Sequence, residues 1–218
     1  MVRYSRPARW FHTAVYVGVF VLLGTGWWLL LGREGERSPL TELLWSDDEH
    51  IHEYTGFVLA ALAALAVLIA SRGTRAFLAE SLRFRRGDGR WLAKWPSAAF
   101  TGRFLYSEGH FDPGQRIANL AFTAGLLVMV GSGIGMVLLP GRDAYAFLET
   151  VHRWTTYALT PVIVGHVLVG SGLLPGYRGV WRSIHWGGEL DTGVARRLWP
   201  GWTENVMARS RREDDAVD

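Results

Sequence analysis

Four long apolar stretches constrain this chain more than any other feature of its sequence. Each holds about 20 residues or more, the length that an α-helix needs to cross the hydrocarbon core of a bilayer. Because lipid offers the backbone no hydrogen-bond partners, spanning segments of this kind are expected to be helices. We therefore predict an all-α membrane protein, a bundle of four transmembrane helices. The stretches are Phe11–Leu31, His52–Ser71, Gln115–Leu139 and Val151–Leu174.

The first stretch does not have the pattern of a cleaved signal peptide. Its apolar run is too long, and no small-residue cleavage site follows the segment GWWLLLG. Tryptophans also gather near the ends of the stretches, as in the aromatic belts of membrane proteins. The tryptophans in these places are Trp10, Trp27, Trp28, Trp45, Trp95 and Trp154.

Basic residues mark the N-terminus, the connection between the second and third stretches, and the C-terminal tail. The other two connections hold few cations and several carboxylates. Since short cytoplasmic loops carry an excess of Lys and Arg, we predict that both termini are cytoplasmic. A nucleic-acid surface is not expected, because the basic segments flank apolar spans. The basic residues of the N-terminus and of the connection between the second and third stretches are Arg3, Arg6, Arg9, Arg72, Arg75, Arg83, Arg85, Arg86, Arg90, Lys94 and Arg103.

The predicted organisation has three regions: a cytoplasmic N-terminus over 1–10, the transmembrane helices over 11–175, and a cytoplasmic arm and tail over 176–218. Ser38–Glu42 predicts a short helix that starts with a proline. Ala76–Phe84 is typical of an interfacial amphipathic helix. The arm is expected to hold a short amphipathic helix, and the charged residues 208–218 are expected to be frayed.

The chain has no cysteine. This excludes disulfides, thiolate ligation of haem, c-type haem attachment and an iron–sulfur cluster held by this chain. If electrons move through the protein, its carriers must be bound by histidine or belong to a partner.

Two histidines lie in the fourth stretch, His152 at its start and His166 fourteen residues later. Fourteen residues are close to four helical turns, so both imidazoles lie on nearly the same helix face, roughly 21 Å apart along the axis. That distance places them near opposite sides of a hydrocarbon core about 30 Å thick. Such a helix could hold two stacked haems.

Two further histidines match these two in depth. With the predicted orientation, His12 and His166 lie on the cytoplasmic side, and His52 and His152 on the outer side. A single histidine at a membrane interface is more often a hydrogen-bonded side chain, but four that pair by depth favour two bis-histidine haems. A zinc site would need three or four ligands at one depth. We interpret His50, His110 and His185 as surface residues.

Small and basic residues near these histidines support the haem hypothesis. Gly56 lies one turn after His52 on the same face, where a flat macrocycle needs a cleft. Arg9 and Arg153 are candidate partners of haem propionates, although Arg9 also has a purely topogenic explanation. Other small residues serve either a cleft or ordinary helix packing. These are Gly24, Gly26, Gly131, Ser132, Gly133 and Gly135.

The chain resembles the gamma (cytochrome b) subunit of respiratory formate dehydrogenases, within the wider group of di-haem, four-helix membrane cytochromes b. The resemblance covers nearly the whole chain in order and spacing. The motifs that carry it are RPARWFH, IHEYTG, DPGQR, VHRWTTYALTPVIVGHVLV and GVWRSIHWGGELDTGVARRLWPGW. It implies two haems b, the outer one ligated by His52 and His152 and the inner one by His12 and His166.

The resemblance also implies a quinone pocket (menaquinone or ubiquinone) beside the inner haem, lined by Asp112, Gly114, Gln115 and His166. The chain departs from the family pattern here, because Asp112-Pro113 stands where Asn-Ala is expected. The implied partners are an iron–sulfur (beta) subunit and a catalytic (alpha) subunit, in the cytoplasmic membrane of a prokaryote.

Three alternatives remain open on the sequence. The same cytochrome b could serve a nickel–iron hydrogenase or a thiosulfate reductase, because the substrate site would lie in another subunit. It could also be a stand-alone transmembrane reductase similar to cytochrome b561. A non-redox helical scaffold or transporter has no evident use for histidines matched in depth.

Overall fold

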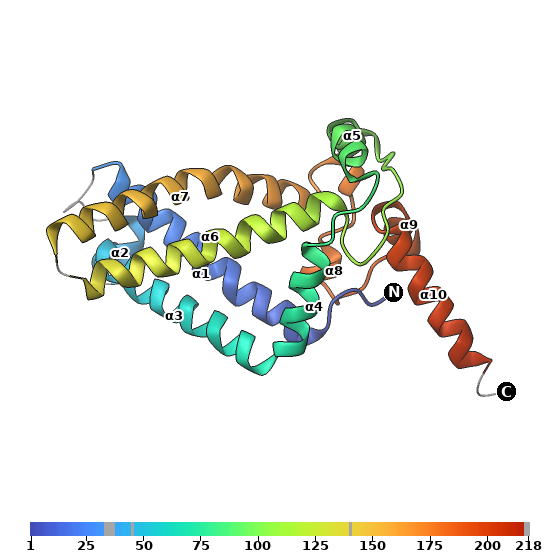
Figure 1. Ribbon diagram of the computed structural model, residues 1–218, viewed down its shortest axis with the longest axis horizontal. Coiled ribbons are helices and arrows are strands. Elements are labelled where there is room, and N and C mark those ends of the chain that lie inside the picture. The colour runs from blue at the N-terminus through green and yellow to red at the C-terminus, as the bar shows by residue number, and fades with distance from the viewer. Residues whose placement is uncertain (33–37, 45, 140, 216–218) are drawn as a thin grey trace. The chain divides into compact units, whose positions relative to one another are not determined.

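The computed structural model describes residues 1–32, 38–44, 46–139 and 141–215 (Figure 1). These residues form helices joined by turns, with one isolated β-bridge between Val2 and Glu189 and no strand in the described ranges. The segment 33–37 and Trp45 of the predicted aromatic belt lie outside them. The helices are α1 Arg6–Leu30, α2 Pro39–Leu44, α3 Asp48–Ile69, α4 Ser71–Ser81, α5 Asp88–Thr101, α6 Pro113–Leu138, α7 Arg142–Gly170, η1 Pro175–Tyr177, α8 Arg182–His185, α9 Thr192–Leu198 and α10 Pro200–Asp214.

Three helices in the described part of the chain are long and apolar enough to cross a membrane: α1, α3 and α6. They correspond to the first three predicted spans. The fourth prediction is a helix too, and α7 is the longest of all with 29 residues. It is not among the three candidates, because polar residues such as His152, Arg153 and Thr155 interrupt its apolar run.

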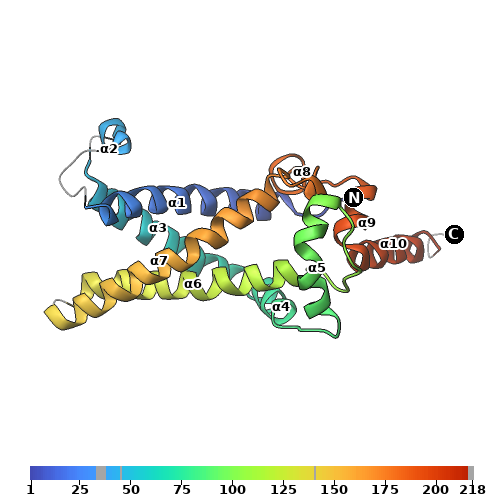
Figure 2. The ribbon, with the colours of Figure 1, turned by 90° about the horizontal axis from the view of Figure 1, so that it is seen from above.

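The chain divides into two compact units. The bundle unit comprises residues 10–74 and 122–162, and the terminal unit comprises residues 1–9, 75–121 and 163–218. The helices α1, α4, α6 and α7 contribute residues to both. Within the bundle unit, the long helical segments run lengthwise in both views (Figures 1 and 2).

Helix packing in the bundle unit uses small residues and one aromatic anchor. A Cβ at Gly125 would lie 2.5 Å from Leu159, so only glycine lets α6 approach α7 this closely. The Trp27 indole donates to Thr160 Oγ1 at 3.2 Å and thereby ties α1 to α7. Large apolar side chains such as Phe20 and Leu127 are exposed, as expected for helices that face lipid.

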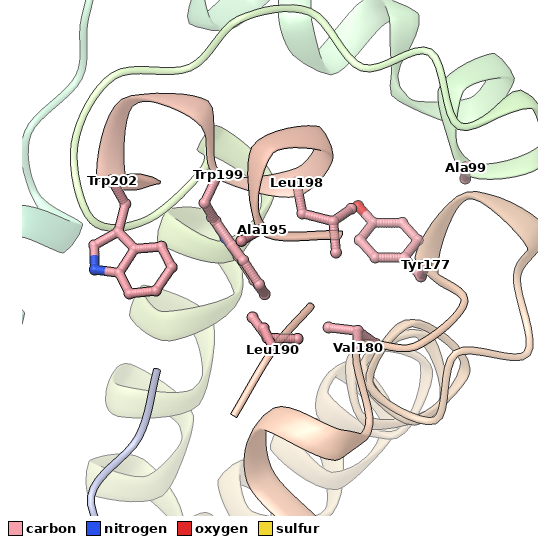
Figure 3. Close-up of a cluster of buried hydrophobic side chains, with 8 residues drawn as sticks. All are labelled: Ala99, Tyr177, Val180, Leu190, Ala195, Leu198, Trp199 and Trp202. Carbon is pink, nitrogen blue, oxygen red and sulfur yellow. The ribbon is translucent and has the colours of Figure 1, made fainter. Parts of the chain in front are cut away.

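The terminal unit has its own apolar core (Figure 3). The chain brings α5 close to η1, where a Cβ on Gly176 would lie 2.5 Å from the Ala98 carbonyl oxygen. The Trp95 indole donates to the Tyr177 hydroxyl at 2.8 Å at the edge of this core. The core residues are Ala99, Tyr177, Val180, Leu190, Ala195, Leu198, Trp199 and Trp202.

The smaller elements differ in part from the sequence predictions. The short helix after Ser38 is confirmed as α2. The predicted interfacial helix starts earlier, because α4 covers Ser71–Ser81. The prediction of a frayed tail is wrong for 208–214, since α10 continues to Asp214 and its arginines stand in the last turn, where they complement the helix dipole. The sequence did not predict α5.

Candidate functional site

Two of the predicted haem ligands lie close together inside the bundle unit. His52 is near the start of α3, and His152 is in the first half of α7. Their ring centroids are 6.1 Å apart, and their planes are inclined by 70°. The structure therefore brings together the pair that the sequence placed at one depth.

A hydroxyl group holds each of these imidazoles from a neighbouring helix. Thr25 Oγ1 of α1 lies 2.9 Å from His52 Nδ1. Ser132 Oγ of α6 lies 2.9 Å from His152 Nδ1. With both Nδ1 atoms engaged, the Nε2 atoms are the nitrogens left to bind a metal.

A glycine follows each of these hydroxyl residues in the sequence and lies against the ring. A Cβ at Gly26 would lie 3.1 Å from His52 Cε1. A Cβ at Gly133 would lie 3.6 Å from His152 Cε1. The first contact is tight, so a methyl group there would displace the His52 ring by a few tenths of an ångström, and the second is an ordinary van der Waals contact.

This donor set fits a haem iron with two axial histidines. Two imidazole nitrogens, each about 2 Å from a metal between them, place the ring centroids about 6 Å apart. The observed separation is 6.1 Å. The hydrogen bonds to Nδ1 supply the outer-shell support that metal-binding histidines commonly have.

The other two predicted ligands belong to different units. His12 is in α1 of the bundle unit, 5.6 Å from the Tyr16 ring. His166 is exposed near the end of α7, in the terminal unit. Their pairing stays a prediction.

The supporting residues have different surroundings. Gly56 has room beside it, because a Cβ there would come no closer than 3.9 Å to its nearest neighbour, the Leu22 side chain. Arg153 forms an ion pair with Glu149 one turn earlier, and both side chains are partly exposed. Arg9 lies beside Gly188 of the arm, where a Cβ would be 3.1 Å from Arg9 Nε. Their roles toward haem stay predictions.

The predicted quinone residues Asp112, Gly114 and Gln115 form the start of α6. Asp112 Oδ1 accepts from the Gln115 backbone N–H at 2.8 Å, which caps the helix. The Gln115 side chain donates to Tyr4 Oη at 3.3 Å and accepts from the Trp199 indole at 3.1 Å. A Cβ at Gly114 would lie 3.2 Å from Trp91, so packing alone explains this glycine.

Asp112 is buried in the terminal unit beside a buried arginine. Burial raises the pKa of the Asp112 carboxyl, and the hydrogen bond from Gln115 and the charge of Arg3 oppose that change. Arg3 lies between the rings of Trp199 and Trp202, 4.4 Å from each centroid. These contacts make a polar and aromatic cluster around the start of α6.

Arg3 also donates to the His110 carbonyl oxygen at 2.6 Å. His110 itself is exposed, as are His50 and His185, so the interpretation of these three as surface residues is confirmed. His50 pairs with the exposed Asp47 at 2.7 Å.

Sequence reasoning missed the hydroxyl contacts of the site. Ser132 stood only among the small residues of its span, and Thr25 was not singled out. The available signal was a hydroxyl residue directly before a glycine within an apolar span, near the predicted depth of His52 and His152. The pattern Thr25-Gly26 recurs as Ser132-Gly133.

Comparison with known proteins gives the family. No curated protein matches the chain. The family model described as prokaryotic cytochrome b561 matches residues 3–187, which is most of the chain. The chain therefore belongs to the prokaryotic cytochrome b561 family of membrane cytochromes, which bind haem b.

Proposed function

We propose that this chain is the membrane-anchoring, di-haem cytochrome b subunit of a respiratory complex of the formate dehydrogenase type. It passes electrons from a partner iron–sulfur subunit to a membrane quinone. The observation that carries the proposal is the pair His52 and His152, whose rings are 6.1 Å apart with both Nδ1 atoms engaged. Membership of a cytochrome b family supports it.

In this proposal four histidines hold two haems b, which supply one-electron transfer when bound. His52 and His152 ligate one, and His12 and His166 ligate the other. Gly56, one turn after His52, leaves space for the macrocycle, and Arg9 and Arg153 bind propionate groups. Four spans with both termini cytoplasmic would place the two haems at different depths.

The quinone site belongs at the start of α6 in this proposal, with Asp112, Gly114, Gln115 and His166. All four lie in the terminal unit. The Gln115 amide and the buried Asp112 carboxyl offer a donor and an acceptor to a quinone. Burial raises the pKa of Asp112, so this carboxyl takes up a proton more readily than an exposed aspartate does.

The alternatives differ in partner more than in this chain. A nickel–iron hydrogenase or thiosulfate reductase would use the same cytochrome b with a different catalytic subunit. A stand-alone reductase similar to cytochrome b561 would work without partners. Formate, hydrogen and thiosulfate therefore serve as the discriminating reagents for the native complex.

A pyridine haemochrome assay on the purified chain tests the haem proposal. We expect two haems b per chain, and one after either His52→Ala or His152→Ala. The control is His50→Ala, because His50 is exposed and pairs only with Asp47 among the ion pairs described. A chain without haem b, or His52→Ala and His152→Ala variants that both retain two haems, contradicts the proposal.

The partner is tested in membranes that hold the native complex. We expect formate to reduce the b haems, and a quinone to reoxidise them. Reduction by hydrogen alone would instead assign the chain to a hydrogenase. Haem reduction by a cytoplasmic donor in the purified chain without partners would favour the stand-alone reductase.

A further inference from the structure

We propose that Thr25 and Ser132 are positioning residues that fix the ring tautomer of His52 and His152 and thereby set the reduction potential of the haem between them. The inference rests on the ligand assignment proposed above and goes beyond it, because it concerns two residues that do not touch the iron. It is carried by the hydrogen bonds that each hydroxyl makes.

Each hydroxyl has a single proton, and a backbone carbonyl one helical turn earlier receives it. Thr25 Oγ1 donates to the Val21 carbonyl oxygen at 2.8 Å. Ser132 Oγ donates to the Val128 carbonyl oxygen at 2.6 Å. A hydroxyl that has donated its proton can only accept.

It follows that the imidazole is the donor in both hydrogen bonds to Nδ1. His52 and His152 therefore carry their proton on Nδ1, and the lone pair is on Nε2. A neutral imidazole binds a metal through the nitrogen that lacks the proton. The two hydroxyls thus select the tautomer that ligates through Nε2.

The two arrangements are equivalent and are shielded from solvent. Thr25 is 2% exposed and Ser132 is 4% exposed, so water does not compete for either hydroxyl. The hydroxyl to Nδ1 distance is 2.9 Å in both. Each hydroxyl residue comes from the long helix before the one that carries its histidine, α1 before α3 and α6 before α7.

A hydrogen bond donated by Nδ1–H moves electron density onto the ring and makes Nε2 a stronger ligand. A stronger donor favours the more highly charged, oxidised iron. The two hydroxyls therefore lower the potential of this haem, and their removal raises it. Hydrogen bonding to a ligand is one of the ways in which a protein tunes haem potential.

Potentiometric titration of the purified haem-loaded chain tests the proposal with Thr25→Val and Ser132→Ala. Valine has the branched shape of threonine but a methyl group in place of the hydroxyl, so Thr25→Val removes the hydrogen-bonding group. We expect each variant to raise the midpoint potential of the haem that His52→Ala eliminates, with a change of up to about tenfold in the reduced-to-oxidised ratio, or ~59 mV. The second haem should not shift.

Two sets of variants separate tuning from simple packing. Thr25→Ser and Ser132→Thr keep the hydroxyl and should restore the parent potential. Thr155→Val is the matched control, because Thr155 Oγ1 also donates to a carbonyl one turn earlier, that of Val151, at 2.7 Å. Its potential should equal that of the parent.

Unchanged potentials in both Thr25→Val and Ser132→Ala overturn the proposal, as does a Thr25→Ser variant that behaves like Thr25→Val. If Thr25→Val loses this haem outright, retention in Thr25→Ser supports the proposal, and loss in both overturns it. A different result would contradict the ligand assignment itself. In that case His52→Ala, made without any other substitution, would keep both haems.

Discussion

At the scale of single residues, the two glycines beside the imidazoles are not equivalent. A Cβ at Gly26 would approach His52 to 3.1 Å, and a Cβ at Gly133 would approach His152 only to 3.6 Å. Gly131, one residue before Ser132, faces open space. A glycine-to-alanine substitution therefore meets decreasing steric hindrance from Gly26 to Gly133 to Gly131.

We predict that Gly26→Ala lowers the haem content and that Gly133→Ala lowers it less. Gly131→Ala should create no clash with a neighbouring side chain. The methyl group of Gly26→Ala must push the His52 ring by a few tenths of an ångström, which costs about 1 kcal/mol or more in a packed interior. Haem content and the reduced absorption spectrum measure the effect. A Gly131→Ala variant that loses more haem than Gly26→Ala would contradict this order.

The histidines could be found from the sequence because intramembrane ionisable residues are rare and their depth follows from helix rise and orientation. Thr25 and Ser132 could not be ranked in this way. A hydroxyl can always bond a carbonyl of its own helix, so its presence in a span says little. Only the approach of His52 from α3, and of His152 from α7, gives these hydroxyls their second contact.

At the scale of elements, the start of α6 has two competing explanations. Asp112 caps the helix through the Gln115 N–H, and Pro113 takes the first helical position, where its missing N–H costs nothing. This is a sufficient structural reason for the pair. The proposed quinone site adds a second role for the same carboxyl.

Asp112→Asn and Asp112→Ala separate these roles. Asparagine caps a helix as well as aspartate, and alanine costs about 1 kcal/mol. If Asp112 only caps α6, Asp112→Asn keeps both stability and the rate of haem reoxidation by quinone. We predict that Asp112→Asn unfolds at the parent temperature but reoxidises more slowly, because the amide cannot take up a proton. Equal reoxidation rates would eliminate the proton role.

The long helices were predictable because apolar length is a strong signal, and the ends of α1, α3 and α6 moved by only a few residues. The start of α7 was not predicted as well, because this helix begins at Arg142, well before the apolar run that starts at Val151. The helices outside the spans were harder. The long connection that holds α5 reads as basic and irregular, and its helix is stabilised by contacts such as the Trp91 indole donating to the Leu105 carbonyl oxygen at 3.1 Å. Such a contact depends on how the segment after α5 folds back against this helix, which the sequence pattern does not reveal.

At the scale of the whole molecule, a buried ion pair stabilises the terminal unit. In the terminal unit, Arg116 is 1% exposed and pairs with Asp88 at 2.8 Å. It also donates to the Arg83 carbonyl oxygen. One buried guanidinium therefore joins α6, α5 and the turn before α5.

We predict that Arg116→Met destabilises the terminal unit by about 3 kcal/mol, because it leaves the Asp88 carboxylate without its cation. The haem held by His52 and His152 should remain, since both belong to the bundle unit. Limited proteolysis measures the first effect, and haem per chain measures the second. The control is the exposed Arg103→Met, and loss of that haem in Arg116→Met alone would show that the units are coupled.

The sequence predicted the class of molecule, an all-α membrane protein, and three of its spans meet the criteria for membrane helices. It did not predict a separate core made by the C-terminal arm. Tryptophans near the ends of apolar stretches are read first as interfacial anchors, whereas Trp199 and Trp202 lie in a core with Leu190 and Ala195. The sequence alone does not distinguish a tryptophan that anchors a helix at the membrane interface from one that packs in a core.

The placement of Arg3 between Trp199 and Trp202 has a consequence for how the protein is made. Arg3 leaves the ribosome before all of the long helices, and the two tryptophans leave it after them. During synthesis, Arg3 therefore cannot contact these two rings until the long helices and the C-terminal arm have been made. A chain that ends before Trp199 lacks both rings. The contact of Arg3 with Trp199 and Trp202 therefore forms only in a product that has been translated through its C-terminal arm.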